Sequence, residues 1–274
     1  MNKFKALVAD FDGTLVDSSL KISPPVENSI KNLMATGFLF SIATARPFQG
    51  IIKKVCSQLL LKSPIIVRAG SEIFDPIRKV SIWAKYIPEP EAKLLIKYCL
   101  ETNQSISLER NREIYVFGKT PSKEYTSGLE IKDFKSLAKY DRISKIVLRS
   151  VEENVLEEFK KTLSSTFKSL HIDISLNPQR KAVLDIISGE TSKKVALYKF
   201  TELVGIKPES AVGIGDGYND QQFLSVCGYK VAMQNAPEEL RKIADMVVGP
   251  AEENGVVEAI DRIFVKVSYG PKRV

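Results

Sequence analysis

The first apolar run of this chain ends in two carboxylates that are followed at once by a glycine. Residues Phe4 to Ala9 are apolar apart from one lysine, and Asp10-Phe11-Asp12-Gly13-Thr14-Leu15 comes directly after them. An apolar run of this length, rich in small and branched side chains, is typical of a strand buried on both faces of a parallel sheet. Open α/β sheets bind ligands at the carboxyl ends of such strands. The stretch therefore predicts a polar site at a sheet edge.

Asp10 and Asp12 cannot both stay ionised a few ångströms apart without compensation. Two like charges about 4 Å apart repel by roughly 4 kcal/mol at an effective dielectric constant of about 20. Either a hard divalent cation held by oxygen ligands offsets this charge, or one carboxyl group keeps its proton and acts as an acid. Both solutions are open at this point.

Length and composition indicate an ordinary globular protein with room for one large domain or two moderate ones. The chain has 274 residues, 44% of them hydrophobic, and a net charge of +7. This charge fits an anionic substrate or a diffusely basic surface. The basic residues are spread along the chain, apart from the tail Lys272-Arg273, and there is no aromatic-basic stacking motif. We expect no nucleic-acid partner.

The few cysteines and the single histidine limit which catalytic and metal sites the chain can form. Cys56, Cys99 and Cys227 are far apart and form no Cys-x-x-Cys pair, so we expect reduced core residues in a cytoplasmic protein. No apolar run is long enough for a signal peptide or a membrane span. The only histidine is His171, which we interpret as structural, because one histidine leaves little room for histidine catalysis or a histidine zinc site.

A second apolar run also ends in polar residues. A helix is predicted to start at Ser23-Pro24-Pro25 and to stop at Gly37. The strand Phe38 to Ala43 follows and ends in Thr44-Ala45-Arg46-Pro47, as a parallel βαβ unit requires. The hydroxyl of Thr44 suits either a helix cap or a donor to a phosphate oxygen.

A third apolar run, Ala211 to Ile214, ends in Gly215-Asp216-Gly217-Tyr218-Asn219-Asp220. Glycines allow a tight turn near a ligand, and the oxygen-bearing side chains suit a hard cation, although the spacing of an EF-hand is absent. Asp216 is expected to bind the metal directly, and Asp220 either to bind it or to orient its waters. Since parallel strands end at one edge of a sheet, the three polar stretches should converge there.

The middle of the chain has a different pattern of predicted helices and strands. From Val80 a helix near Glu91 to Glu101 leads into a predicted antiparallel hairpin, Ser105 to Glu109 with Ile114 to Phe117. A further strand, a helix and another strand are predicted at 143–148, 152–167 and 170–176. The run Ala182 to Ile187 is expected to return to the core, before a helix at Ser192 to Leu203. We therefore predict an α/β parallel-sheet core of residues 1–79 and 184–274, interrupted by an α+β domain of residues 80–183.

These motifs resemble those of the haloacid dehalogenase superfamily of phosphotransferases. Asp10 to Leu15 resembles the first motif, Thr44 in Ile-Ala-Thr-x-Arg-Pro the second motif of the Cof-type branch, and Lys193 after Ser192 the third. Gly215 to Asp220 matches the fourth. The chain departs from the branch at Ala45, where glycine is common, at Lys194, which also replaces a glycine, and at Ala69-Gly70-Ser71, where Asn-Gly-Ala is usual.

The resemblance implies a Rossmann-like core with a type C2 cap and a mechanism through an aspartyl phosphate. Asp10 would be the nucleophile and Asp12 the general acid and base. Mg²⁺ would be held by Asp10, Asp216, Asp220 and the backbone carbonyl of Asp12. The candidate phosphate-binding residues are Thr44, Arg46, Lys193 and Asn219.

The function predicted from these features is hydrolysis of a small phosphorylated metabolite, with a sugar phosphate preferred, by a monomer or weak homodimer. A phosphomutase would share every core residue, and a non-catalytic phosphometabolite-binding protein would have little need of Asp12. An ion-pumping ATPase would need membrane spans, and a receiver domain is much shorter. Arg110, Arg112, Arg180 and Lys181 are the basic residues of the inserted region that could meet a second anionic group of the substrate, although simple surface exposure explains them too.

Overall fold

The computed structural model describes residues 3–151, 161–163, 165–176 and 182–265. Most of the helix expected at 152–167, the pair Arg180 and Lys181, and the tail Lys272-Arg273 lie outside these residues. Among the helices of the described ranges, none combines the length and the apolar character that crossing a membrane requires. The three cysteines are buried with free thiols.

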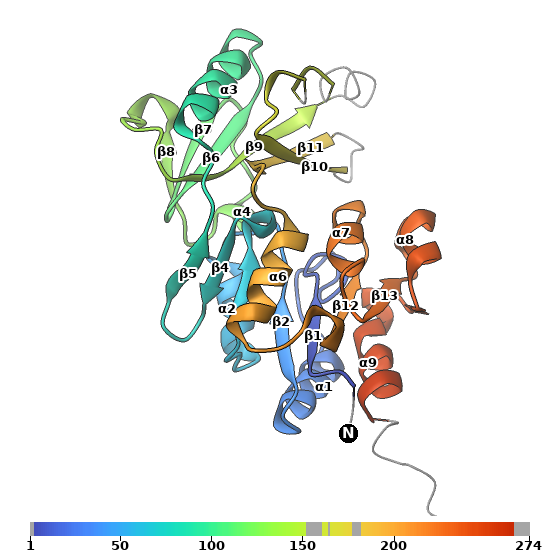
Figure 1. The fold of residues 1–274 in the computed structure, drawn as a ribbon. Coiled ribbons are helices and arrows are strands. Elements are labelled where there is room, and N and C mark those ends of the chain that lie inside the picture. Colours follow the sequence, from blue (N-terminus) through green and yellow to red (C-terminus); the bar gives the residue numbers. More distant parts are fainter. Residues whose placement is uncertain (1–2, 152–160, 164, 177–181, 266–274) are drawn as a thin grey trace, which may run out of the picture.

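The core is a parallel sheet of five strands in the order β14-β13-β12-β1-β2 (Figure 1). Strand β1, which lies between β12 and β2, is buried along its whole length, with Leu7 and Ala9 in the hydrophobic cluster on one face and Ala6 and Val8 in the cluster on the other. The predicted burial on both faces is therefore confirmed. The strands are β1 (Ala6–Ala9), β2 (Leu39–Ile42), β12 (Ala211–Gly215), β13 (Tyr229–Met233) and β14 (Met246–Val248).

Helices cover both faces of this sheet. Helix α1 starts as predicted, because the Ser23 hydroxyl accepts a hydrogen bond from the Val26 N–H at 3.3 Å and prolines fill the first helical positions. Apolar side chains of α1, α2 and α9 pack in one cluster and those of α6, α7 and α8 in the other. The helices are α1 (Pro24–Ala35), α2 (Ile51–Gln58), α6 (Lys193–Leu203), α7 (Gln221–Leu224), α8 (Glu238–Ile243) and α9 (Gly255–Ile260).

A small antiparallel sheet extends the core beside β2. It is built from β3 (Ile65–Val67), β4 (Glu72–Asp75) and β5 (Val80–Ala84). A parallel bridge between Ala43 and Ile66 connects it to the end of β2. The chain thus stays with the core until the end of β5.

The inserted domain, which we call the cap, is an α+β unit with its own sheet and its own core. Its strands run in the order β10-β11-β9-β6-β7-β8, antiparallel except for β7 and β8. Helix α3 (Glu89–Glu101) packs into the cap core through Leu95, Ile96 and Cys99. The strands are β6 (Ile106–Arg110), β7 (Glu113–Phe117), β8 (Glu130–Asp133), β9 (Ile143–Val151), β10 (Leu170–Leu176) and β11 (Ala182–Ser188). The short helix α4 (Lys123–Thr126) comes between β7 and β8 in the chain. The predicted hairpin of β6 and β7 is confirmed.

Strand β11 differs from the sequence-based expectation, which placed Ala182 to Ile187 in the core. It lies between β10 and β9 in the cap sheet and is antiparallel to both. The physical reason is that an apolar run indicates a buried strand but not the sheet in which it is buried. We therefore place the two connections between core and cap after Ala84 and after Ser188.

Candidate active site

Three core strands deliver polar side chains to one edge of the parallel sheet. Asp10 follows β1 directly, Thr44 follows β2 after one residue, and Asp216 follows β12 directly. Because β1 is paired with both β2 and β12 in parallel register, these ends lie side by side. Carboxylate oxygens of Asp10, Asp216 and Asp220 lie within 4.8 Å of one another. The convergence expected from the strand ends is present.

Lys193 enters the same cluster from the first turn of α6. Its ammonium lies 2.5 Å from Oδ1 of Asp10 and 2.7 Å from Oδ1 of Asp220, and its side chain is 1% exposed. Burial by itself would lower the pKa of Lys193, but the carboxylates of Asp10 and Asp220 raise it above its ordinary value. Lys193 is therefore a permanent cation in this site. The neighbouring Lys194 is half-buried.

Asp220 organises the loop after β12. Its side chain is fully buried, and its Oδ2 accepts hydrogen bonds from the backbone N–H groups of Asp216 at 3.0 Å and Gly217 at 2.9 Å. One carboxylate oxygen thus fixes the loop, while the other faces Lys193. Asn219 lies in the same short turn and is half-buried.

Asp216 is held by two donors that the sequence analysis did not assign to the site. The Thr14 hydroxyl donates to Oδ1 at 3.0 Å, and the Asn235 amide donates to Oδ2 at 3.1 Å. Gly13 has φ +75°, and a Cβ atom there would overlap the Asp216 carboxylate, so glycine is needed for both conformation and space. The place of Asn235 after β13, another strand that ends at this edge, is the feature that could have identified it.

The acidic cluster carries more negative charge than Lys193 offsets. Burial first, and then the nearby Asp220, raise the pKa of Asp216 to about 7. Burial and the same neighbour also raise the pKa of Asp10. Three carboxylates whose oxygen atoms lie this close together suit a hard divalent cation, which would relieve their mutual repulsion.

Asp12 is not one of the three clustered carboxylates. Its carboxylate is paired in bidentate fashion with Arg46, with Nε 2.8 Å from Oδ2 and an Nη atom 2.7 Å from Oδ1. The Asp12 side chain is 45% exposed, whereas that of Asp10 is 10% exposed. Arg46, expected to bind phosphate, uses its guanidinium in this structure to hold Asp12.

Thr44 is buried, and its hydroxyl accepts a hydrogen bond from the Arg46 N–H at 3.1 Å. Its carbonyl accepts one from the N–H of Ala69 at 3.1 Å. Ala69 has φ 59°, a left-handed conformation that asparagine tolerates better than alanine. This backbone conformation gives a physical reason for the asparagine that is usual at this position in the Cof-type branch, apart from any contact with substrate.

Of Arg110 and Arg112, the residues considered for a second anionic group, Arg110 is the last residue of β6, and Arg112 lies in the turn before β7. Arg110 is paired with Asp141 at 3.0 Å and lies 3.5 Å from Glu113. Arg112 is exposed and lines a cavity of about 210 Å³ together with Lys53, Lys79 and the stacked rings of Phe48 and Phe74.

Comparisons with known proteins agree with this architecture. The family model of haloacid dehalogenase-like hydrolases matches residues 7–260. A protein of Buchnera aphidicola subsp. Schizaphis graminum that carries a phosphatase name is 27% identical, over 96% of this chain and 97% of its own. The 5-amino-6-(5-phospho-D-ribitylamino)uracil phosphatase YwtE of Bacillus subtilis is 24% identical, over 95% of this chain and 98% of its own.

Solved structures share the fold over nearly the whole chain. A haloacid dehalogenase-like hydrolase from Bacteroides thetaiotaomicron superposes with a TM-score of 0.81 and 25% identity, over 95% of this chain and 100% of that one. A sugar phosphatase of subclass IIB superposes with a TM-score of 0.79 and 23% identity, over 94% and 98%. The chain therefore belongs to the haloacid dehalogenase-like hydrolases, as a Cof-like phosphatase whose Rossmann-like core carries an inserted cap.

Proposed function

We propose that this phosphatase is a Mg²⁺-dependent phosphomonoester hydrolase that acts through an aspartyl phosphate on a small phosphorylated metabolite. The observation that carries the proposal is the difference in environment between two neighbouring aspartates. Asp10 lies in the acidic cluster beside Lys193, and Asp12 lies outside it, half-exposed and paired with Arg46. This difference supports attack by the Asp10 carboxylate and proton transfer by Asp12.

In the first step the Asp10 carboxylate attacks phosphorus, the bond from phosphorus to the ester oxygen breaks, and Asp12 protonates the departing alkoxide. Lys193, which lies 2.5 Å from Asp10, and the Thr44 hydroxyl supply positive charge and a hydrogen bond for the phosphoryl oxygens. Arg46 holds Asp12 in place for the transfer.

In the second step Asp12, now a carboxylate, takes a proton from water, and the hydroxide oxygen attacks phosphorus. The bond between phosphorus and the Asp10 oxygen breaks, which releases inorganic phosphate and restores Asp10. The same side chain therefore acts as acid and then as base.

Asp10, Asp216 and Asp220, with the Asp12 carbonyl, would hold Mg²⁺, and Thr14 and Asn235 would orient Asp216 toward it. When bound there, Mg²⁺ would supply positive charge that offsets the negative charge developing during phosphoryl transfer. The free, buried thiols of all three cysteines support a reducing compartment, which in a cell is the cytoplasm.

The test is a screen of phosphomonoesters with Mg²⁺, including an aryl phosphate, sugar phosphates and phosphorylated ribityl compounds. The names of the solved sugar phosphatase and of the Bacillus subtilis relative suggest the last two classes. We expect release of inorganic phosphate, abolished by EDTA. Asp10→Asn should lower kcat by roughly 10³-fold or more without changing the thermal unfolding temperature by more than a few degrees.

Three outcomes would count against the proposal. Full activity in Asp10→Asn would exclude an aspartyl phosphate on Asp10. An isomerised hexose phosphate, formed without net release of phosphate and stimulated by a bisphosphate, would identify a phosphomutase instead. Absence of turnover on every ester would favour a phosphometabolite-binding protein.

A further inference from the structure

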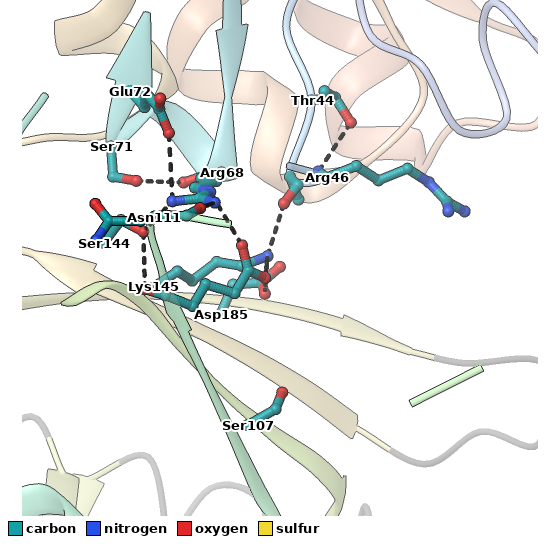
Figure 2. Close-up of polar contacts among 12 residues, drawn as sticks. Thr44, Arg46, Arg68, Ser71, Glu72, Ser107, Asn111, Ser144, Lys145 and Asp185 are labelled. Atoms are coloured by element: carbon teal, nitrogen blue, oxygen red, sulfur yellow. Dashed lines mark hydrogen bonds and ion pairs between the residues drawn. The ribbon is translucent and has the colours of Figure 1, made fainter. Parts of the chain in front are cut away.

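Lys145 is a cap residue whose ammonium reaches the core (Figure 2). It lies on β9, and its Nζ donates to the carbonyl oxygen of Ala45 at 2.6 Å. Ala45 stands between Thr44 and Arg46, which both belong to the candidate active site. The Lys145 side chain is 1% exposed, and a hydrogen bond from a charged donor in such a dry environment is strong and costly to lose.

The charge of Lys145 is fixed by its cap neighbours. Nζ lies 3.0 Å from Oδ1 of Asp185 on β11 and 3.3 Å from Oε1 of Glu109 on β6, and the ring of Tyr125 on α4 lies 5.4 Å away. Burial by itself would lower the pKa of Lys145, but Asp185 and Glu109 raise it above its ordinary value. The ammonium therefore keeps its three donors, and the one directed at Ala45 is the contact that leaves the cap.

Three consecutive carbonyl groups of the Thr44 to Arg46 loop are each held by a donor. The Thr44 carbonyl accepts from the Ala69 N–H at 3.1 Å and the Arg46 carbonyl from the Arg68 N–H at 2.9 Å. Both of those donors belong to the core. The middle carbonyl, that of Ala45, is held by Lys145 of the cap, so the position of the cap decides whether the loop is fully fixed.

We propose that Lys145 is a positioning residue that couples cap closure to the active site, by fixing the Ala45 carbonyl and with it the orientation of Thr44 and Arg46. The inference rests on the proposed phosphatase function. When the cap is closed, the loop holds the Thr44 hydroxyl and the Asp12 partner Arg46 in their working positions. When the cap opens for exchange of substrate and product, the Ala45 carbonyl loses this donor, and the site is incomplete until the cap returns.

The test compares two variants that differ only at Lys145. Lys145→Met alone would leave Asp185 without this cation, while Glu109 would keep only Arg68, 3.3 Å away, as its cationic partner. An unpaired charge at a buried position commonly destabilises a protein strongly. The double variant Lys145→Met/Asp185→Asn removes one charge of each sign and should fold. Asp185→Asn alone is the matched control, because it keeps Lys145, its pairing with Glu109 and its contact with Ala45.

Relative to Asp185→Asn, the double variant should lower kcat on an aryl phosphate by roughly 10- to 100-fold, since small misplacements of catalytic groups cost about that much, with KM little changed. Amide hydrogen exchange read by mass spectrometry should become faster in the peptide that covers residues 44–48. Exchange in α3, which belongs to the cap core, should stay as in the control.

Equal kcat and equal exchange of residues 44–48 in the two variants would overturn the proposal. A loss of turnover with unchanged exchange in that peptide would overturn it as well, because Lys145 would then act on the substrate directly and not through Ala45. If the wild-type protein hydrolyses no phosphomonoester, the proposed function fails by itself, while the exchange comparison still decides whether Lys145 orders the loop.

Discussion

At the scale of the residue, Asp10 and Asp12 are two positions apart and have opposite environments. Asp10 is buried against Lys193 in a cluster of carboxylates, which raises its pKa through burial and the charge of Asp220. Asp12 is half-exposed, and its carboxylate accepts hydrogen bonds from Nε and from an Nη atom of Arg46. Two identical side chains thus have different surroundings, which supports the separate roles proposed for them, since paired carboxylates generally divide acid-base work in this way.

This division predicts the behaviour of Asp12→Asn. An aryl phosphate has a good leaving group that needs little protonation, so phosphorylation of Asp10 should proceed. Activation of water should be slowed by roughly 10²- to 10⁴-fold, because the general base is gone. We expect phosphate to accumulate on the protein, measured by intact-mass spectrometry after acid quenching.

The double variant Asp10→Asn/Asp12→Asn is the control and should carry no phosphate. Normal steady-state turnover in Asp12→Asn, with no protein-bound phosphate, would contradict the role of Asp12. Asparagine keeps the shape of the side chain next to Arg46, so a loss of fold should not confuse the result.

At the scale of the element, the turn after β1 is fitted to the loop after β12. Gly13 adopts φ +75°, and its missing Cβ leaves space for the Asp216 carboxylate. Thr14, the next residue, donates to that carboxylate at 3.0 Å. The two motifs thus depend on each other, since the first provides the space and one donor, and the second provides the proposed metal ligand.

Gly13→Ala should weaken Mg²⁺ binding by displacing Asp216, beyond the strain of roughly 1–2 kcal/mol that a left-handed alanine costs. Gly205→Ala is a matched control, because Gly205 has φ +71° and a Cβ atom added there would meet nothing within 4 Å. Both variants should lose similar stability in EDTA. The Mg²⁺ concentration for half-maximal activity should rise at least about tenfold, equal to 1.4 kcal/mol, in Gly13→Ala and stay unchanged in Gly205→Ala. An equal effect in both would exclude displacement of Asp216.

At the scale of the whole molecule, the core concentrates negative charge at one sheet edge, and the cap contacts the neighbouring Thr44 to Arg46 loop through Lys145. The pKa of Asp216, raised to about 7 from 3.8, makes the metal-free protein sensitive to pH. Between these values the folded protein keeps a proton that the unfolded chain has released. The stability of the metal-free protein therefore falls as pH rises toward 7.

We accordingly expect the unfolding temperature in EDTA to be lower at pH 8 than at pH 6. Mg²⁺ should bind more tightly at pH 8, where Asp216 is ionised, and offset this loss. A ligand at 100 times its Kd stabilises a protein by about 2.7 kcal/mol. Differential scanning fluorimetry with and without Mg²⁺ at both pH values measures the effect. In Asp216→Asn both the pH dependence and the effect of Mg²⁺ should be smaller. Equal stabilisation by Mg²⁺ at pH 6 and pH 8 in the wild-type protein would contradict the interpretation.

The sequence by itself determined which strands end in reactive side chains. An apolar run that stops at Asp10 or at Asp216 marks both a buried strand and its carboxyl end, and parallel topology then brings such ends together. The α/β core, the α+β cap with its β6–β7 hairpin, and the family are confirmed on this basis. All of this information is local, and it depends on periodicity and on polar residues that end each run.

Only the tertiary structure decided the contacts made across the chain. It assigned β11 to the cap sheet, paired Arg46 with Asp12, and brought Asn235 onto Asp216. It also directed Lys145 at the carbonyl of Ala45, 100 residues earlier in the chain. The physical reason is that a backbone carbonyl has no sequence identity of its own, and the partner of a strand or a charge is fixed by packing that no local pattern encodes.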